Sequence, residues 1–254
     1  MKKILPFIVF IAIAASYYFF IYDPSDTKMM FDYTDEFESF NDEFWYIGQW
    51  KTNKSMMNDI DIKNGILTLK VNETDRGPYL LSKPLQIDED YVIKIKRRVK
   101  IKYSNDKFTG GLTLFQTDST ILEPDKKVEN WYDAFGQAAV LVEYVHNYNE
   151  DSTRPGRHIF RVLPPTWEAL DSARLIKPIF DEWFEEEVIF DTRMNRISYI
   201  VNGKEVHTGG LKFDKDYIRF FTHPYGWGVG HKMMIDWINI KIIDESIDKR
   251  GKDE

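Results

Sequence analysis

The chain contains no cysteine and only five histidines in 254 residues. Without cysteine there is no disulfide framework, no catalytic thiol and no lipid attachment through a cysteine. The histidines show no close paired spacing of the kind that zinc sites use, so we expect no catalytic zinc. Three glycines follow one another closely in residues 223–231, but no Lys-Ser or Lys-Thr pair comes after them. This excludes a phosphate-binding loop.

The charge balance is acidic, with 34 Lys and Arg against 41 Asp and Glu and a formal net charge of −7 at pH 7. Such a field repels the phosphate backbone, so we expect no nucleic-acid partner. Hydrophobic residues make up 43% of the chain and aromatic residues 15%. For a chain of this length these fractions predict one folded domain with a substantial core.

The longest apolar run lies at the N-terminus, where Lys2 and Lys3 precede an uncharged stretch that reaches Tyr22. Its length matches the roughly 20 residues that span a bilayer. The lysines favour a cytoplasmic N-terminus, with the domain outside. We therefore interpret residues 1–22 as a signal anchor of a single-pass membrane protein. The small residues Ala12, Ala14 and Ala15 leave a second interpretation open, a cleaved signal peptide and a secreted protein.

The remaining chain divides by composition into a short polar tether at residues 23–30, one domain at 31–243 and a charged, disordered tail at 244–254. Within the domain, runs rich in β-branched and aromatic residues alternate in polarity, and no helical periodicity competes with them. These runs predict strands at residues 66–71, 79–82, 91–103, 109–116, 138–148, 158–163, 184–190, 196–201, 217–222 and 233–243.

The C-terminal strands carry clear turn signals, Asn195 and the pair Asn202-Gly203. We expect residues 184–222 to form an antiparallel meander that ends in the strand at 233–243. In this last strand Asp236 is in phase with Ile238 and the other isoleucines, which predicts an acid on the apolar face. A buried acid of this kind requires a partner.

This order of elements resembles the concanavalin A-like jelly roll of lectins and family 16 glycoside hydrolases. Trp183 opens a strand, the Asn202-Gly203 hairpin follows, and residues 235–240 read apolar-Asp-aromatic-apolar-x-apolar. Residues 31–50, with an acidic-Phe pair followed by a Trp, are similar to the family's opening strand. The resemblance implies an all-β sandwich of two antiparallel sheets.

The resemblance also locates the strand that is catalytic in these hydrolases, where carboxylates on one face are about 5 Å apart for retaining cleavage. Glu143 falls at the position of the acid/base. Ala138 or Ala139 stands at the position of the nucleophile, and Val140 or Leu141 at that of the middle acid. An alanine cannot attack an anomeric carbon. We therefore expect a domain that binds carbohydrate without cleaving it.

Sugar recognition uses aromatic rings flanked by side chains that hydrogen-bond hydroxyl groups. The chain offers such residues around the central strand and in the glycine-rich stretch, and we predict a glycan or polysaccharide as the partner. The candidate binding residues are Trp131, Tyr132, Glu143, Tyr144, His146, Arg157, Tyr225 and Trp227. For Trp227, folding back over the end of the sandwich is an equal alternative.

Two other functions stay open. A polysaccharide-degrading enzyme, either a glycoside hydrolase or a lyase, would act through Glu143 or through Tyr144 and His146, which we place on the open face of their strand. A structural or adhesive protein would keep its aromatic residues in the core. One sandwich scaffold supports all three functions.

The resemblance further implies a structural calcium between the opening strand and the last one, held by Asp236 together with Asp35 or Glu36. A pairing of Asp236 with backbone amides or with a cationic side chain is an equal alternative. Residues 91–102 alternate between apolar and basic side chains, with Arg97 as the one break. The basic side chains form either a stripe for acidic polysaccharide or anionic lipid, or a solvated face offset by Glu185 and Glu187.

Overall fold

The computed structural model describes residues 28–49, 60–72, 77–87, 90–102, 108–117, 137–146, 157–162, 171–174, 179–212, 214–226 and 230–245. These residues form sixteen strands in two antiparallel sheets and no helix. The predicted all-β class and the two-sheet architecture are therefore confirmed. Within the described ranges, no helix long and apolar enough to cross a membrane is found. The predicted anchor at residues 1–22 lies outside them.

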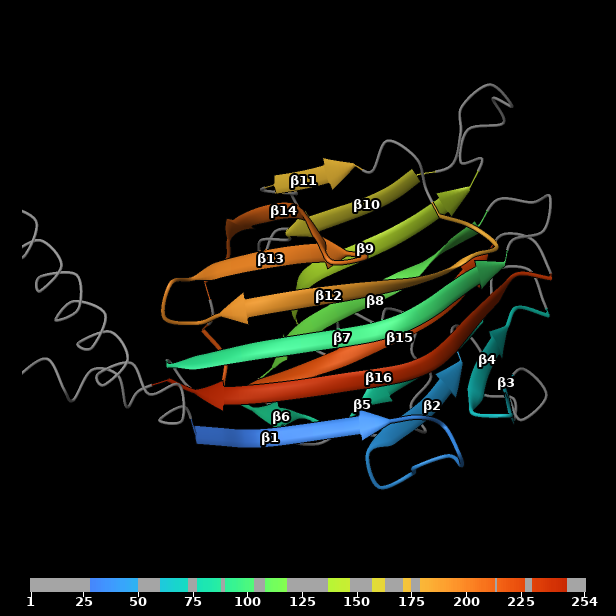
Figure 1. The fold of residues 1–254 in the computed structure, drawn as a ribbon, viewed down its shortest axis with the longest axis horizontal. Coiled ribbons are helices and arrows are strands. Elements are labelled where there is room, and N and C mark those ends of the chain that lie inside the picture. The colour runs from blue at the N-terminus through green and yellow to red at the C-terminus, as the bar shows by residue number, and fades with distance from the viewer. Residues whose placement is uncertain are drawn as a thin grey trace, which may run out of the picture.

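The first sheet has its long strands at the centre (Figure 1). Its order is β14 (Lys204–Gly210), β13 (Arg196–Val201), β12 (Trp183–Asp191), β7 (Tyr91–Lys102), β16 (Lys232–Asp244), β4 (Ile66–Lys70) and β3 (Ile60–Lys63), and β1 (Lys28–Asp35) also pairs with β16. Strand β1 thus begins within the stretch that we expected to be a tether.

The second sheet lies behind the first in the view of Figure 1. Its order is β11 (Asp171–Arg174), β10 (Arg157–Val162), β9 (Gln137–His146), β8 (Phe108–Thr117), β15 (Tyr217–Gly226), β5 (Pro78–Ser82) and β2 (Trp45–Gln49), and β6 (Leu85–Gln86) also pairs with β15.

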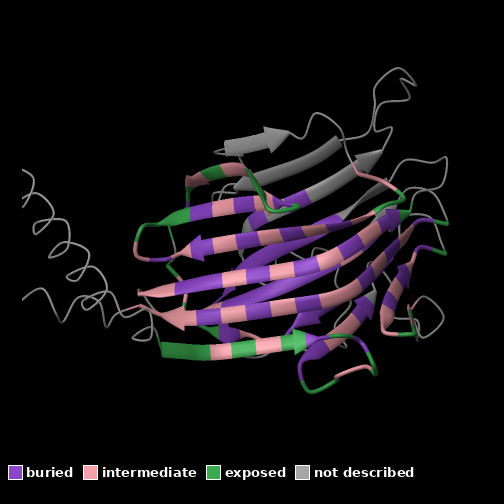
Figure 2. Ribbon diagram, viewed as in Figure 1, coloured by how far each residue is buried: buried purple, intermediate pink, exposed green. Residues whose placement is uncertain are grey.

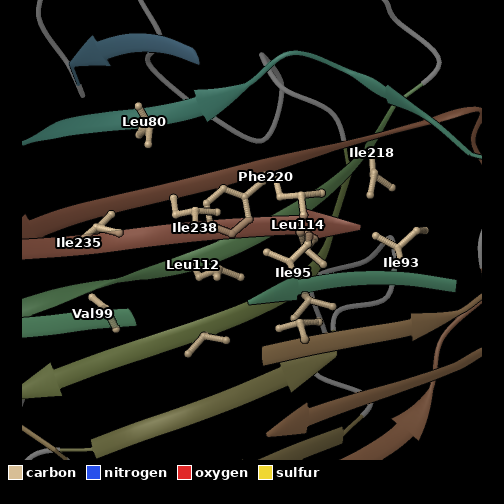
Figure 3. Packing of buried hydrophobic residues seen from close by; sticks show 14 of the residues in the cluster. Leu80, Ile93, Ile95, Val99, Leu112, Leu114, Ile218, Phe220, Ile235 and Ile238 are labelled. Carbon is tan, nitrogen blue, oxygen red and sulfur yellow. The ribbon is translucent and has the colours of Figure 1, made fainter. Parts of the chain in front are cut away.

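The core lies between the two sheets, because every long strand turns alternate residues inward. Figure 2 shows this alternation as stripes of buried and partly exposed residues along β7, β12 and β16. Side chains from both sheets meet in one cluster, in which Ile95 and Ile238 of the first sheet pack with Leu112, Leu114 and Phe220 of the second (Figure 3). Burying each such side chain contributes about 1.5–3 kcal/mol.

An ion pair is buried within this apolar layer. The Arg97 Nε donates a hydrogen bond to Glu186 Oε1 at 2.5 Å, and the two side chains are 0% and 1% exposed. The Tyr199 hydroxyl donates to the other Glu186 oxygen at 2.6 Å, and Arg97 also donates to the Thr222 hydroxyl of the second sheet. Arg97 therefore points inward with the apolar residues of β7, and the pair joins the two sheets.

The hairpin turns lie where the sequence predicts them, with Asn195, Asn202 and Gly203 at φ of 47°, 48° and 75°. The predicted antiparallel meander of residues 184–222 is wrong in one respect. Strands β12, β13 and β14 follow one another in the first sheet, but β15 belongs to the second sheet, where it pairs with β8. The edge strand β14 completes the hairpin in its place.

The position of Asp236 is a second correction. A β-bulge between Ile235 and Trp237 shifts the phase of β16, so Asp236 leaves the apolar face. Its side chain is 30% exposed and forms an ion pair with Arg98 at 2.5 Å.

The outer face of the first sheet is of mixed charge. Lys96 pairs with Glu185 at 2.8 Å, and both side chains are about 40% exposed. Arg98 lies over the Trp183 ring at 5.1 Å, and Lys96 lies over Trp237 at 5.7 Å. These contacts fit the solvated, charge-balanced face that was one of our two interpretations of residues 91–102.

The acidic-Phe pair and the tryptophan of the opening segment form one hydrogen-bonded unit. Asp35 is buried, and its carboxylate accepts hydrogen bonds from Trp45 Nε1 at 2.7 Å, the Tyr33 hydroxyl at 2.7 Å and the Phe37 backbone at 2.8 Å. Burial and the neighbouring Asp35 carboxylate raise the pKa of the Tyr33 hydroxyl, so it stays a donor. This unit fixes β1 against β2, which belongs to the second sheet.

Candidate functional site

The candidate site is the outward face of the second sheet, defined as the side chains of its strands that are out of phase with the core. No described strand packs on this face. Four aromatic rings cluster around Phe221 on it, and those of Tyr79, Phe115 and Phe221 are buried. The Phe221 ring lies 5.3 Å from Tyr79, 5.6 Å from Phe115 and 4.8 Å from His223. Gly48 of β2 makes room for this cluster, since a Cβ there would lie 1.9 Å from the Tyr79 ring.

Strand register places polar residues beside these rings. His223 of β15 is opposite Gly111 of β8, and Gly111 is opposite Glu143 of β9, so the three share one face. Two strand spacings separate His223 from Glu143, about 10 Å between Cα atoms. Gly111 carries no side chain, so strand β8 places none between these two positions.

Of the predicted binding residues, the fold brings three to the outward face. Glu143 is joined there by Arg157 and Tyr225, which lie at the two ends of the cross-strand row formed with Thr109 and Val145. Tyr225 was predicted in a loop, but β15 continues through Gly226. The extension arises because β8 supplies pairing partners as far as Phe108.

The other predicted residues do not join this face. Tyr144 and His146 are in phase with Val140 and Val142, which are fully buried in the core cluster. Our placement of Tyr144 and His146 on the open face is therefore wrong, because the face they share with these valines turns toward the first sheet. Trp131, Tyr132 and Trp227 lie outside the described residues.

The described strands place one carboxylate on the outward face. Among them, only Glu143 and Asp171 are acids in the second sheet, and Asp171 shares a cross-strand row with Val162 and with Val140, which is buried in the core. The residue before Glu143 on the same face of β9 is Leu141. Closer to the N-terminus of β9, a β-bulge at Ala139 interrupts the register. Strand β9 thus places no second acid beside Glu143 on this face, whereas retaining cleavage of a glycosidic bond requires two.

Two polar residues of this face were missed from the sequence. Arg219 is buried, and desolvation lowers the pKa of its guanidinium to about 10, which keeps it charged at neutral pH. Thr113 is fully buried, and its hydroxyl has no hydrogen-bond partner in the part of the chain that the structure describes. The sequence pattern that could have revealed them is a polar residue that alternates with apolar residues along a strand.

His223 is held in its neutral form. Burial, together with the positive charge of Arg97, lowers the pKa of its imidazole to about 3. A neutral imidazole both donates and accepts a hydrogen bond, which suits the hydroxyl groups of a sugar.

We expect this shift to make stability depend on pH. The unfolded chain takes up a proton at His223 near pH 6.5, whereas the folded protein resists protonation until the pH approaches 3. Between these values the unfolded state binds more protons, so stability falls as the pH falls, by at most about 1.4 kcal/mol per pH unit. In urea titrations at pH 7 and pH 5, His223→Gln should lose less stability than the wild type. Equal losses of stability in the variant and the wild type would contradict a lowered pKa at His223.

The two carboxylates of the expected calcium site do not fit a shared cation. The oxygens of Asp35 accept three hydrogen bonds from protein donors, and Asp236 pairs with Arg98. Across the described ranges, no group of three or more acidic or histidine side chains is arranged to hold a metal ion.

Comparisons with known proteins agree with this architecture. No protein-family model matches the sequence, and no curated protein is similar to it in sequence. Solved structures do match. The carbohydrate recognition domain of Emp47p is 14% identical with a TM-score of 0.60, covering 86% of this chain and 98% of its own.

A laminarinase catalytic domain from Thermotoga maritima is 13% identical with a TM-score of 0.59, covering 85% of this chain and 98% of its own. Peanut lectin is 13% identical with a TM-score of 0.58, covering 85% and 97%. At such identities the likeness establishes the fold and leaves open which of these activities, if either, the chain has. The chain therefore has the concanavalin A-like jelly-roll fold, which lectins and endo-glucanases share.

Proposed function

We propose that this protein is a lectin-like domain that binds a glycan on the outward face of the second sheet without cleaving it. The observation that carries the proposal is the composition of that face. Strand register places Glu143, Arg157, Tyr225 and His223 on it, and such polar groups can orient the hydroxyls of a sugar. The rings of Tyr79, Phe115 and Phe221 on the same face are buried, so they pack this face instead of stacking on a sugar.

The proposal includes a location at the cell envelope, with the domain outside the cytoplasm. Residues 1–22 would hold it at a membrane or, if cleaved, release it as a secreted protein. Met29 and Met30 support the membrane-bound form, because they are exposed apolar side chains on β1, close to that segment in the chain.

A second candidate function is a polysaccharide-degrading enzyme. One observation favours it: His223, Tyr225, Arg157 and Glu143 share one face, which supplies a neutral base, a phenol, a cation and an acid. Such an enzyme would use Glu143 with these residues, since Tyr144 and His146 are in phase with the core.

The test measures binding and turnover with the same full chain, kept in solution by mild detergent. A glycan array and a panel of polysaccharides should reveal binding without release of reducing sugars or unsaturated uronates. We expect Glu143→Ala to weaken this binding about tenfold or more, because a charged hydrogen-bond acceptor is lost. Glu185→Ala, which removes an acid from the outer face of the first sheet, is the matched control and should bind as the wild type does.

Three results would change the conclusion. Binding that survives both Glu143→Ala and Trp227→Ala would move the site elsewhere. Turnover that disappears in Glu143→Gln while binding persists would establish the enzyme. No binding to any glycan would remove the proposed function and leave a structural role.

A further inference from the structure

The large hydrophobic side chains that remain exposed lie together at one end of the first sheet. Among the described residues they are Met29, Met30 and Met194, which are 47%, 42% and 62% exposed. A single exposed apolar side chain is ordinary on a protein surface, but a group of them marks a surface that contacts something else. We call these three residues the methionine end.

Strand register brings β1 and the turn that contains Met194 to the same end of the sheet. Met29 is opposite Ile243 of β16, which is opposite Val92 of β7. Val92 in turn is opposite Asp191 of β12, and the Met194 backbone N–H donates to the Asp191 carboxylate at 3.2 Å. Three strand spacings, about 14 Å, therefore separate β1 from this turn. Figure 1 shows the start of β1 and the end of β12 at one end of the sheet.

An irregularity in β1 exposes both of its methionines. Successive side chains of a regular strand point to opposite faces, so one of the two would turn inward. The register shifts between Met29 and Phe31, which makes Met30 the extra residue of a β-bulge on an edge strand. Both methionines are consequently exposed, as the start of β1 in Figure 2 shows.

Ion pairs hold the turn beside the last strand and neutralise the acids around Met194. The Arg193 guanidinium bridges Asp191 at 2.9 Å and Glu245, which follows β16, at 2.5 Å. Paired carboxylates carry less net charge into contact with an apolar phase than free ones do. The surroundings of Met194 therefore allow contact with lipid.

The chain that precedes β1 departs from the methionine end, because β1 runs from Lys28 away from it toward Asp35. Five residues separate Lys28 from Tyr22, the last residue of the N-terminal apolar run. Fully extended, the stretch from Tyr22 to Lys28 spans at most about 20 Å. An anchor at residues 1–22 would therefore hold the methionine end beside the surface of the bilayer.

We infer that the sandwich docks onto the bilayer through the methionine end, with the side chains of Met29, Met30 and Met194 inserted among the lipid headgroups. This inference rests on the membrane location in the proposed function and names the surface that contacts the lipid. Methionine suits such a contact because its side chain is apolar, unbranched and flexible, so it adapts to irregular surroundings.

Docking through this end would direct part of the proposed glycan-binding face away from the membrane. Tyr225 and Pro224 lie toward the opposite end of the sandwich, since a Cβ on Gly77 would meet the Pro224 carbonyl at 2.2 Å and Val71 at 3.4 Å. Val71 accepts a hydrogen bond at 2.8 Å from Gly230, just before β16 begins. The Tyr225 end of that face would then be open to a long glycan.

Because the chain has no cysteine, a nitroxide label can be placed at any single position that is changed to cysteine. The full chain is placed in phosphatidylcholine nanodiscs. Electron paramagnetic resonance then compares collisions of the label with oxygen, which concentrates in lipid, and with a nickel chelate, which stays in water. Labels at Met30→Cys and Met194→Cys should be several-fold less accessible to nickel than a label at Glu182→Cys. Glu182 is an exposed residue at the opposite end of β12.

A label beside the methionines tests their contribution without replacing them by the label. Lys28 is exposed next to Met29, and a label at Lys28→Cys should gain nickel accessibility when Met29, Met30 and Met194 are all changed to serine. Met234→Ser, on β16 near its opposite end, is the matched control and should leave the label unchanged. The three methionines are exposed, so the triple variant should fold, which its melting temperature verifies.

A label at Ala12→Cys separates this inference from the proposed function. If that label is in lipid while those at positions 28, 30 and 194 are as open to nickel as the one at 182, docking is wrong and the anchor stands. If the label at position 12 is in water, the membrane location fails and docking fails with it. Spin–spin broadening between labels at position 194 would show that a second copy covers the methionine end, which also overturns docking. Glycan binding is measured separately on the array.

Discussion

Glu186→Ala is expected to lower the free energy of unfolding by about 3–5 kcal/mol. The substitution leaves Arg97 fully buried with its charge uncompensated, and Tyr199 loses its acceptor. The Arg97 guanidinium cannot reach water unless the two sheets separate. The variant therefore retains an unpaired buried charge in its folded state, which lowers the free energy of unfolding. Urea denaturation followed by tryptophan fluorescence measures it.

Two further variants isolate the charge effect. The double variant Arg97→Met/Glu186→Leu removes both charges and should recover most of the loss, because apolar side chains of similar size replace a buried pair at little cost. Glu185→Ala breaks the neighbouring exposed pair with Lys96 and should cost less than about 1 kcal/mol. A double variant as unstable as the single one would show that the effect is packing and not charge.

Asp35→Ala is expected to have the second largest effect, a loss of about 2–4 kcal/mol. The alanine would leave the Trp45 Nε1, the Tyr33 hydroxyl and the Phe37 backbone without their common acceptor. Buried donors that lose a charged acceptor retain the full cost of their desolvation. Thermal unfolding should show a lower midpoint, with β1 detaching from β2.

The matched comparisons for Asp35 come from the same strands. Asp32→Ala removes an exposed acid of β1 that pairs with Lys241 at 3.3 Å and should cost less than about 1 kcal/mol. Trp45→Phe retains an aromatic ring but removes the donor, so it should cost about 1–2 kcal/mol. A loss in Asp35→Ala no greater than that of Asp32→Ala would exclude the hydrogen-bonded unit as a stabilising element.

The sequence predicts the long strands well because their alternation is strong, as in β7, β12 and β16. It misses β3, β6, β11 and β14, since the first three are short and the edge strand β14 is largely exposed. The alternation also defines the two faces of a strand without stating which sheet the strand joins. For this reason β15 was placed in the wrong sheet.

Prediction of the candidate site from the sequence is limited for the same reason. Glu143 is found from the resemblance and Tyr225 from the aromatic residues of the glycine-rich stretch, but the face that they share with Arg157 depends on register between four strands. Tyr144 and His146 are on the opposite face of β9 from Glu143, so they were predicted only because the wrong face of the strand was taken as the open one. The buried ion pair is visible in the sequence, because Arg97 and Glu186 each occupy a position where their strand would otherwise have an apolar residue. Two such positions of opposite charge predict that the two side chains pair in the core.

Strand β16 has consequences for how the chain reaches its folded state. It pairs on one side with β7 and on the other with β1 and β4, so the last strand along the chain joins the first one to the rest of its sheet. Pairings between such distant segments close large loops and fold slowly. A nascent chain that ends before Lys232 has no partner for β1, so the first sheet closes only after nearly the whole domain has been synthesised.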